Sequence, residues 1–295
     1  MQRWYTAPVR RIIVNADDFG LTSGVNRAII ELHRGQVLIS ATLMARATAT
    51  EGAIEIAKST PSLGVGCHVV LVDGEPVLPV EQLGTLASRR TGRFHSSLAT
   101  FLRRLLAGMI RPEEIEAEAH AQISTLQSRG VKLTHIDTHK HTHMFPAVLR
   151  PVLRAARACG ICAVRNPFEP AWSLRATLDA PFARRTQVRV LHMLEPRFRR
   201  AVVEEGFSTT DGSIGVLATG SLTARTVASL LKNMPEGTFE LVTHPGYNDS
   251  DLGRVNTRLR ASREIERDAL AALQNAGEVE LISYVDLSPR PLTHT

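Results

Sequence analysis

The chain has 295 residues, of which 43% are hydrophobic and 22% are charged. This length and composition suit one large folded domain and exclude a globally disordered chain. No apolar run reaches the roughly 18 residues that a membrane-spanning helix needs, and the N-terminal MQRWYTAPVRR lacks the apolar core of a signal peptide. We therefore expect a cytoplasmic protein.

The net charge is +6 and the pI is near 9.7, with arginines clustered at 89–90, 103–104, 184–185 and 197–200. We interpret these clusters as a solvated basic surface, which would also suit an acidic substrate or a protein close to an anionic membrane. No aromatic-interleaved basic motif or zinc-finger pattern accompanies them, so a nucleic-acid partner is not expected. The sequence is compatible with a homo-oligomer but does not specify one.

Short runs rich in Val, Ile and Leu alternate with helical stretches. In chain order, strands are predicted at 11–16, 38–43, 64–70, 133–138, 161–165, 213–217, 239–243 and 279–284. Helices are predicted at 23–34, 112–129, 146–158, 223–233 and 258–275, several of which start at Pro or a capping residue and stop before Gly. About seven βα units imply a parallel sheet closed as a (β/α) barrel, with an open doubly wound sheet as the alternative.

Two stretches interrupt this alternation, and we interpret them as insertions in a single domain spanning 1–295. Residues 71–94 carry Gly, Pro and mixed charge and predict a long loop. Residues 168–212 are basic, contain several prolines and show little periodicity. Long insertions on a barrel often cover its active site.

The three cysteines are an odd and low number, which argues against a disulfide framework. Cys67 stands alone, and Cys159 and Cys162 form a C-x-x-C pair with no second pair downstream. We interpret the pair as ordinary buried thiols and not as a zinc or redox centre.

Adjacent carboxylates stand at the end of the first predicted strand, in the sequence NADDFG. On a regular strand Asp17 and Asp18 would point to opposite faces. They can address one site only if the strand ends there and the chain turns, which Phe19-Gly20 permits. The alternative is a polar strand end that caps the next helix.

The fourth predicted strand leads into a dense histidine cluster, THIDTHKHTH. Its imidazoles and its carboxylate recur at every second position: His135, Asp137, His139, His141 and His143. We expect the strand to end near His139 and the last two histidines to line the following loop. Because neutral imidazoles are costly to bury without partners, metal ligation is the simplest use of this cluster.

Polar groups fall at the carboxyl ends of four predicted strands: Asp17-Asp18, His68, His139 and His244. In a parallel barrel these ends converge on one face, where catalytic groups gather. One carboxylate and two imidazoles can hold a divalent metal and leave room for water and substrate. A second carboxylate could take a proton from that water and a histidine could protonate a departing amine, so the set can hydrolyse an amide without a covalent intermediate.

Four segments, NADDFGLTSGVNRAI, PSLGVGCHVVLVDGEPVLP, THIDTHKHTHMFP and ELVTHPGYND, span residues 15–249. In these segments the sequence resembles the YdjC-like carbohydrate deacetylases, a family of chitooligosaccharide deacetylases and hopanoid-biosynthesis-associated deacetylases. The resemblance implies an irregular TIM-like barrel and a hydrolase that uses Mg²⁺ or Zn²⁺ to remove the N-acetyl group of an N-acetylglucosamine-containing saccharide or glycolipid. The wording VVLVDGEPVLP is closer to the hopanoid-associated branch, which implies an N-acetylglucosaminyl lipid.

Carried over residue by residue, the resemblance implies that Asp18, His68 and His139 are the metal ligands. It implies that Asp17 is the general base and that His244, in the H-P motif, is the general acid. The three ligands are expected to meet around one cation, with the base and the acid on either side of it.

The remaining residues of the histidine cluster receive supporting roles from the same resemblance. His143 is the alternative ligand, since some related deacetylases use two histidines four residues apart. Asp137 and His141 are implied to orient the ligands.

Two other functions stay open on the sequence: a different metallohydrolase on the same scaffold, such as a phosphoesterase, and a non-catalytic sugar- or lipid-binding protein. Trp172, Tyr247 and Arg165 are candidates to line a sugar pocket, although each is better interpreted as a structural residue.

Overall fold

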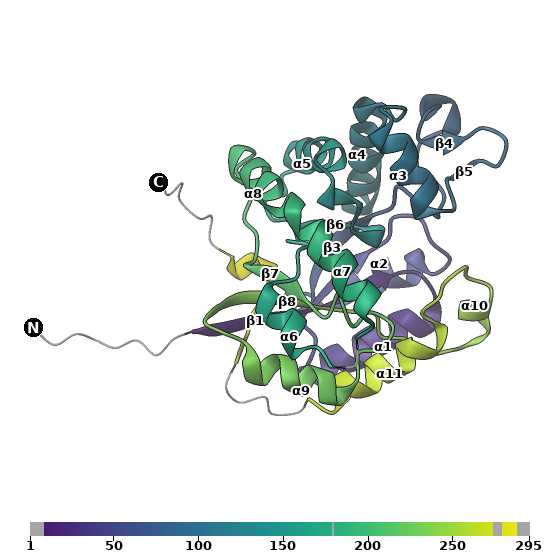
Figure 1. Ribbon diagram of the computed structural model, residues 1–295. Coiled ribbons are helices and arrows are strands. Elements are labelled where there is room, and N and C mark those ends of the chain that lie inside the picture. Colours follow the sequence, from purple (N-terminus) through teal and green to yellow (C-terminus); the bar gives the residue numbers. More distant parts are fainter. Residues whose placement is uncertain (1–8, 179, 274–278, 288–295) are drawn as a thin grey trace, which may run out of the picture.

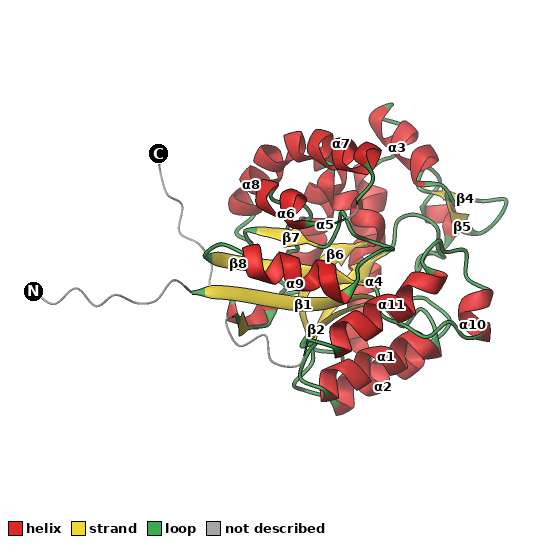
Figure 2. Cartoon of the chain, turned by 60° about the horizontal axis from the view of Figure 1, so that its bottom comes forward, coloured by secondary structure: helices red, strands yellow, loops and turns green. Residues whose placement is uncertain are grey.

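Parallel strands form a curled sheet at the centre of the molecule, and helices pack around it (Figures 1 and 2). The computed structural model describes residues 9–178, 180–273 and 279–287. The strands of the main sheet are β1 Arg10–Phe19, β2 Ser40–Leu43, β3 Gly64–Val69, β6 Leu133–Thr138, β7 Gly212–Ile214, β8 Gly237–Thr243 and β9 Glu280–Leu281. Their order is β6-β3-β2-β1-β8-β7, with β9 paired to β1 outside this path. A separate antiparallel pair joins β4 Ala87–Ser88 to β5 Arg93–Phe94.

Irregular pairing extends the sheet beyond its edge strands, β6 and β7. Isolated parallel bridges join Ile136 to Val164 and Ala163 to Ser208, and Ser208 precedes β7 in the chain. The segment that contains Ala163 and Val164 therefore lies between β6 and the approach to β7. This arrangement confirms the predicted irregular TIM-like barrel over the open doubly wound sheet.

Helices cover the outside of the sheet. Their bounds are α1 Ser23–Arg34, α2 Thr50–Ser59, α3 Leu98–Leu106, α4 Pro112–Ser128, α5 Pro146–Ala158, α6 Ala171–Ala176, α7 Phe182–Leu191, α8 Glu195–Glu204, α9 Ala224–Asn233, α10 Ser250–Gly253 and α11 Arg260–Ala271. Short 3-10 turns are η1 Val80–Gln82, η2 His139–Met144, η3 His192–Leu194 and η4 Tyr284–Asp286. In Figure 2, α1, α2 and α11 lie below the strands and α5, α7 and α8 lie above them. Within the described residues, no helix is both long and apolar enough to cross a membrane.

Local sequence signals explain why several helices begin where they were predicted to begin. The Thr22 side chain accepts a hydrogen bond from the Val25 backbone N–H and so caps α1. Helices α4 and α5 begin at proline, whose missing N–H has no role in a first helical turn. By contrast, α2 begins without a capping side-chain hydrogen bond. Neither α2 nor α3 has a counterpart among the predicted helices.

Alternate residues of β1 serve two different cores. Ile12 and Val14 belong to the large apolar cluster between strands and helices. Inside the barrel, a small apolar cluster consists of Ile13, Ala163, Ile282 and Tyr284. Because side chains alternate along a strand, Asn15 and Asp17 point to the same side as Ile13. The barrel interior is therefore apolar below and polar towards the carboxyl ends of the strands.

Several predicted elements are shorter in the structure. Residues 161–165, predicted as a strand, contribute only the isolated bridges, and 279–284 contain the two-residue β9. The predicted helix 258–275 is α11, and its last two residues lie outside the described residues. Residues 1–8, most of the segment judged not to be a signal peptide, lie outside them as well.

Both predicted insertions carry secondary structure. Residues 71–94, predicted as a loop, contain η1 and the β4–β5 pair, and 168–212 contain α6, α7 and α8. The prolines of the second insertion stand where helices start: Pro170 and Pro181 at N-cap positions and Pro196 in the first turn of α8. At these positions proline starts a helix and does not interrupt it.

The three cysteines are free. Cys67 is buried, Cys159 is half-buried and Cys162 is exposed. The prediction of two buried thiols in the C-x-x-C pair is therefore wrong for Cys162.

Candidate active site

Asp17 and Asp18 reach the same end of the barrel because β1 is irregular near its carboxyl end. Asp18 has a left-handed backbone conformation with a φ of 64°, and the pairing of β1 with β2 shifts register between Ala16 and Phe19. An irregularity of this kind lets consecutive side chains face one site, which a regular strand forbids. The predicted break therefore lies at Asp18 itself, before Phe19-Gly20.

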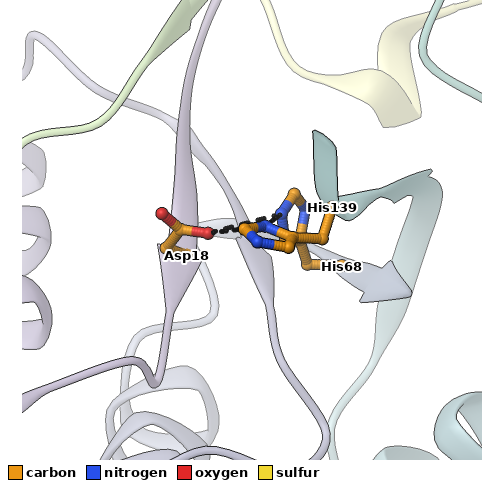
Figure 3. Close-up of side chains that lie close together, drawn as sticks. All are labelled: Asp18, His68 and His139. Carbon is orange, nitrogen blue, oxygen red and sulfur yellow. Dashed lines mark hydrogen bonds and ion pairs between the residues drawn. The ribbon is translucent and has the colours of Figure 1, made fainter. Parts of the chain in front are cut away.

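Asp18, His68 and His139 come from β1, β3 and the start of η2, and their side chains converge (Figure 3). Asp18 Oδ1 lies 3.4 Å from His68 Nε2 and 3.3 Å from His139 Nδ1. The two imidazole nitrogens are 3.3 Å apart. A tetrahedral metal about 2.0–2.1 Å from each ligand atom would hold such atoms roughly 3.3 Å from one another. The three residues that the sequence singles out as ligands thus have the spacing of a metal site.

The hydrogen bonding and charge of this cluster also suit a cation. Asp18 Oδ1 is buried without a hydrogen-bond partner among the described residues, although buried carboxylate oxygens usually have one. The buried carboxylates here belong to Asp17, Asp18, Asp137, Glu240 and Glu266, and the buried guanidiniums belong to Arg165 and Arg263. Five carboxylates against two guanidiniums leave an excess of acidic groups, which favours binding of a cation.

A second set of ligand-type atoms, from Asp17, His68 and Asp137, is also close enough together to hold an ion. Both carboxylates of this set already pair with the buried Arg165 guanidinium. A cation there would compete with that arginine. The set of Asp18, His68 and His139 is therefore the better fit.

Asp137 fixes the orientation of His68. Its Oδ1 lies 2.7 Å from His68 Nδ1, and Thr42 Oγ1 lies 3.2 Å from the same nitrogen. Burial alone would lower the pKa of His68, but the adjacent Asp137 carboxylate raises that pKa to about 10. Holding Nδ1 in this way turns Nε2 towards the cluster, as carboxylate–histidine pairs do at metal sites. Asp137 thus has the position expected for an orienting residue.

Arg165 lies beneath the cluster, and its side chain is fully buried. Its Nη2 donates to Asp17 Oδ1 over 2.6 Å and its Nη1 donates to Asp17 Oδ2 over 2.9 Å. It also donates to Asp137 and, from Nε over 2.8 Å, to Glu240 Oε1. Burial alone would raise the pKa of Asp17, but Arg165 holds that pKa well below its usual range. Arg165 therefore keeps Asp17 ionised and in place, and its burial separates it from any sugar at the surface.

Glu240 is a buried residue of this network that the sequence analysis missed. It lies in β8, accepts a hydrogen bond from Arg165 Nη2 over 2.6 Å and accepts another from the Tyr284 hydroxyl. Burial raises its pKa. The available signal was one charged residue inside the apolar run FELVT, because a charge in a strand covered on both faces needs a buried partner.

Helix α11 supplies two further buried groups that the sequence analysis missed, Arg263 and Glu266. Arg263 Nη2 donates to Asp18 Oδ2, whereas Oδ1 faces the two histidines. Glu266 Oε2 accepts the backbone N–H of His244 over 2.6 Å and lies 3.6 Å from its Nδ1. Both residues lie on a helix, away from the strand ends that guided the sequence analysis.

His244 is close to Asp17. Its Nε2 lies 3.7 Å from Asp17 Oδ2, and 11% of its side chain is exposed. Burial alone would lower the pKa of His244, but Glu266 and Asp17 raise it above its ordinary value and so favour the imidazolium. Asp17 and His244 are therefore direct neighbours in the structure.

The later histidines of the cluster follow the end of β6 at Thr138, as predicted. His143 Nδ1 lies 2.8 Å from Thr138 Oγ1, and its Nε2 lies 3.2 Å from the Arg165 carbonyl oxygen. Both of its ring nitrogens are thus engaged away from the ligand triangle. His141 has a left-handed backbone, and within the described residues no hydrogen bond or ion pair joins it to a predicted ligand; burial lowers its pKa to about 3.

Three other residues that the sequence analysis considered make structural contacts. His135 stacks on Tyr284 with ring centroids 3.8 Å apart. Trp172 packs edge-on against Phe239 at 5.1 Å. The Tyr247 ring lies between two guanidiniums, 3.6 and 4.1 Å from its centroid.

Comparison with protein families identifies the relatives of this chain. The family described as YdjC-like protein matches residues 11–277. The chain belongs to the YdjC-like family. A carbohydrate deacetylase of Geobacillus stearothermophilus is 42% identical over 280 residues, which cover 93% of this chain and 97% of the relative. A carbohydrate deacetylase of Brevibacillus brevis is 35% identical over 240 residues, which cover 81% and 82%.

Solved structures agree with the fold. A protein from Enterococcus faecalis, described as a candidate cellobiose-phosphate cleavage protein, superposes with a TM-score of 0.73 at 24% identity, covering 94% of this chain and 98% of the other. A lactam utilization protein from Thermus thermophilus gives a TM-score of 0.51 at 15% identity, covering 92% and 98%. These likenesses support the barrel architecture of this YdjC-like protein.

Proposed function

We propose that this protein is a metal-dependent hydrolase that removes the N-acetyl group from an N-acetylglucosamine-containing saccharide or glycolipid. Membership of the YdjC-like family and relatives named carbohydrate deacetylase support the deacetylase class. The observation that carries the metal-dependent mechanism is the triangle of Asp18, His68 and His139 beside buried acid–base groups. The cytoplasmic location expected from the sequence is part of this proposal.

The three ligand residues would hold a divalent cation, which when bound polarises the acetamide carbonyl and makes water more acidic. Two imidazoles with one carboxylate suit Zn²⁺ more closely than Mg²⁺, which prefers oxygen ligands. Asp18 would bind through Oδ1, while Arg263 holds Oδ2.

Asp17 is the general base of this proposal. Because Arg165 keeps its carboxylate ionised, Asp17 is in the unprotonated form that a general base needs. Its Oδ2 is the oxygen closer to His244, so the base and the acid serve neighbouring positions on the substrate amide.

His244 is the general acid. The Glu266 carboxylate favours its protonated form, and Nε2 faces the cluster side of the residue, next to Asp17. The imidazolium would donate its proton to the departing sugar amine. Glu266 also holds the His244 backbone N–H, which fixes the residue that carries the acid.

An acetate-release assay tests this function. Metal-stripped protein is supplied with Zn²⁺, Mg²⁺, Mn²⁺ or Co²⁺ separately and incubated with N-acetylglucosamine, diacetylchitobiose or an N-acetylglucosaminyl lipid. We expect acetate only when a divalent metal is present. Absence of acetate from every substrate with every metal would contradict the proposal. Phosphate release from phosphate esters in its place would identify a phosphoesterase, and metal-independent sugar binding without turnover would identify a binding protein.

A further inference from the structure

A helical run at the outside of the molecule presents apolar side chains to solvent. Helix α7, η3 and α8 follow one another without a break, and the residues at both junctions keep right-handed helical backbone angles. No residue of α7 is buried. In Figure 1 α7 crosses in front of the strands, and in Figure 2 it lies at the upper edge of the fold. The exposed side of this run is therefore not used to build the core.

One face of the run mixes large apolar side chains with arginines. We define this outer face as Phe182, Arg189, Val190, Met193, Arg197 and Arg200, all exposed and recurring at about helical spacing. Phe182, Val190 and Met193 are 81%, 59% and 77% exposed. On the opposite side of the run, α8 buries Phe198 and Val202.

The arginines of the outer face are not used by the fold. Within the described part of the chain, Arg189, Arg197 and Arg200 make no hydrogen bond or ion pair. Other arginines of the same run do: Arg184 and Arg185 donate to backbone carbonyls, and Arg199 donates to Glu195. Free cations beside exposed Phe, Val and Met are the composition of a helix that lies in the interface of an anionic membrane.

The run is attached to the end of the barrel that carries the candidate site. Arg184 Nη2 donates to the Val216 carbonyl oxygen over 3.0 Å, and Val216 follows β7 at its carboxyl end. This hydrogen bond joins α7 to the end of the barrel that carries the candidate site. A surface bound by the outer face would thus lie on the same side of the molecule as that site.

We propose that the outer face binds the surface of an anionic phospholipid membrane. Its apolar side chains would enter the headgroup region, and its arginines would pair with lipid phosphates. A second copy of this chain is a poorer occupant, because a two-fold interface would set the same three arginines against each other, in a chain of net charge +6. Membrane binding itself does not depend on the proposed function; its consequence, a lipid-linked acetamido substrate, does.

Co-sedimentation with vesicles tests the proposal. The wild-type protein should bind vesicles of phosphatidylcholine mixed with phosphatidylglycerol, bind phosphatidylcholine vesicles far less, and be released by high salt. Each arginine near an anionic surface strengthens binding roughly fivefold, so the triple variant R189Q/R197Q/R200Q should bind about a hundredfold more weakly. Phe182→Ser with Met193→Ser should weaken binding at low salt as well.

A matched control is available on α3 and its end, where Leu106 and Met109 are 75% and 52% exposed. The variant L106S/M109S should bind vesicles as the wild type does. The proposal is overturned if the wild type ignores anionic vesicles, if the outer-face variants bind like the wild type, or if the control loses as much binding as they do. It is also overturned if F182S/M193S converts a stable dimer into monomers while the wild type does not bind vesicles.

Two further measurements keep the result unambiguous. Thermal unfolding of each variant checks that the fold is retained, and the arginine variant decides the matter if the apolar variant fails to fold. Acetate release from a soluble acetamido sugar should be unchanged in the outer-face variants. Failure of the wild type to bind vesicles with this activity intact refutes the membrane proposal alone, whereas absence of acetate in the wild type concerns only the proposed function.

Discussion

The barrel interior and the outer face of α7–α8 both carry arginines, but in opposite situations. Arg165 is fully buried and bonds to three carboxylates. Arg189, Arg197 and Arg200 are exposed and pair with none of the described residues. A buried charge requires compensation, and an exposed one does not. The same residue type therefore supports the catalytic groups in one region and remains available to an external partner in the other.

The comparison predicts where substitutions matter. Inside the barrel each charge relies on the others, so removing one leaves its partners buried and unpaired. On the outer face each side chain is surrounded by water, and a single change should hardly affect the fold. Matched substitutions in the two regions can break or sharpen this contrast.

The largest effect is expected for Asp17→Asn. An amide cannot take a proton from water, so kcat for acetate release should fall about 10²–10⁴-fold, as when a general base is removed. Metal affinity, measured by calorimetry, should stay close to the wild-type value. Asp268→Asn, at an exposed pair with Arg267, is the control. If kcat of the Asp17→Asn variant stayed within a factor of about ten of the wild-type value, Asp17 would not be the general base.

Arg165→Met should be the most damaging change to stability. It leaves Asp17, Asp137 and Glu240 without their shared cation, and breaking a buried ion pair costs about 3–5 kcal/mol in the free energy of unfolding. Arg189→Met on the outer face should change that free energy by less than about 0.5 kcal/mol. Urea denaturation measures the free energy of unfolding of both variants. Similar decreases for the two variants would contradict the contrast between the buried and the exposed arginines.

Metal removal should have an intermediate effect. A ligand at about 100 times its dissociation constant stabilises the folded state by about 2.7 kcal/mol, so chelation should lower the melting temperature and added Zn²⁺ should restore it. His139→Ala should abolish this metal-dependent shift. His192→Ala, which removes a partly exposed imidazole paired with Glu195, should retain this shift. A shift that survives in H139A would show that the ion binds elsewhere.

The smallest effect is expected for Glu266→Gln. The Glu266 carboxylate raises the pKa of His244, so the imidazolium persists to higher pH and activity is lost as pH rises through that raised pKa. Without the carboxylate the alkaline limb of the kcat profile should move to lower pH. Glu204→Gln, at the exposed pair with Arg150, should leave the profile in place. If the alkaline limb of the kcat profile did not move in E266Q, a group other than the His244–Glu266 pair would determine it.

Much of the barrel follows from local signals in the sequence. Proline at the start of α4 and α5 and the Thr22 cap of α1 mark helix ends that the structure reproduces closely. The strand predicted at 161–165 is reduced to isolated bridges at Ala163 and Val164, because strand pairing depends on neighbours distant in the chain. The second insertion was the least predictable, since its prolines indicate loops as readily as helix starts.

The convergence of the candidate ligands was predictable because each stands where a strand ends. The network below them was less so. Glu240, Arg263 and Glu266 come from a strand interior and a helix, and only the tertiary fold shows that they meet Arg165, Asp18 and His244. Sequence spacing finds groups that address a common face, but it does not find the charges that compensate them.

The backbone of Asp18 has a consequence for how this protein tolerates change. A left-handed φ of 64° costs an ordinary residue roughly 1–2 kcal/mol, and glycine avoids that cost. A chain optimised for thermostability alone would therefore tend to replace Asp18 with glycine, which gains stability and loses the carboxylate. The ion pair between Asp18 and Arg263 opposes such a replacement, because it stabilises the carboxylate at a position with an unfavourable backbone conformation. Consensus or computational redesign of this scaffold should treat the two positions as one unit.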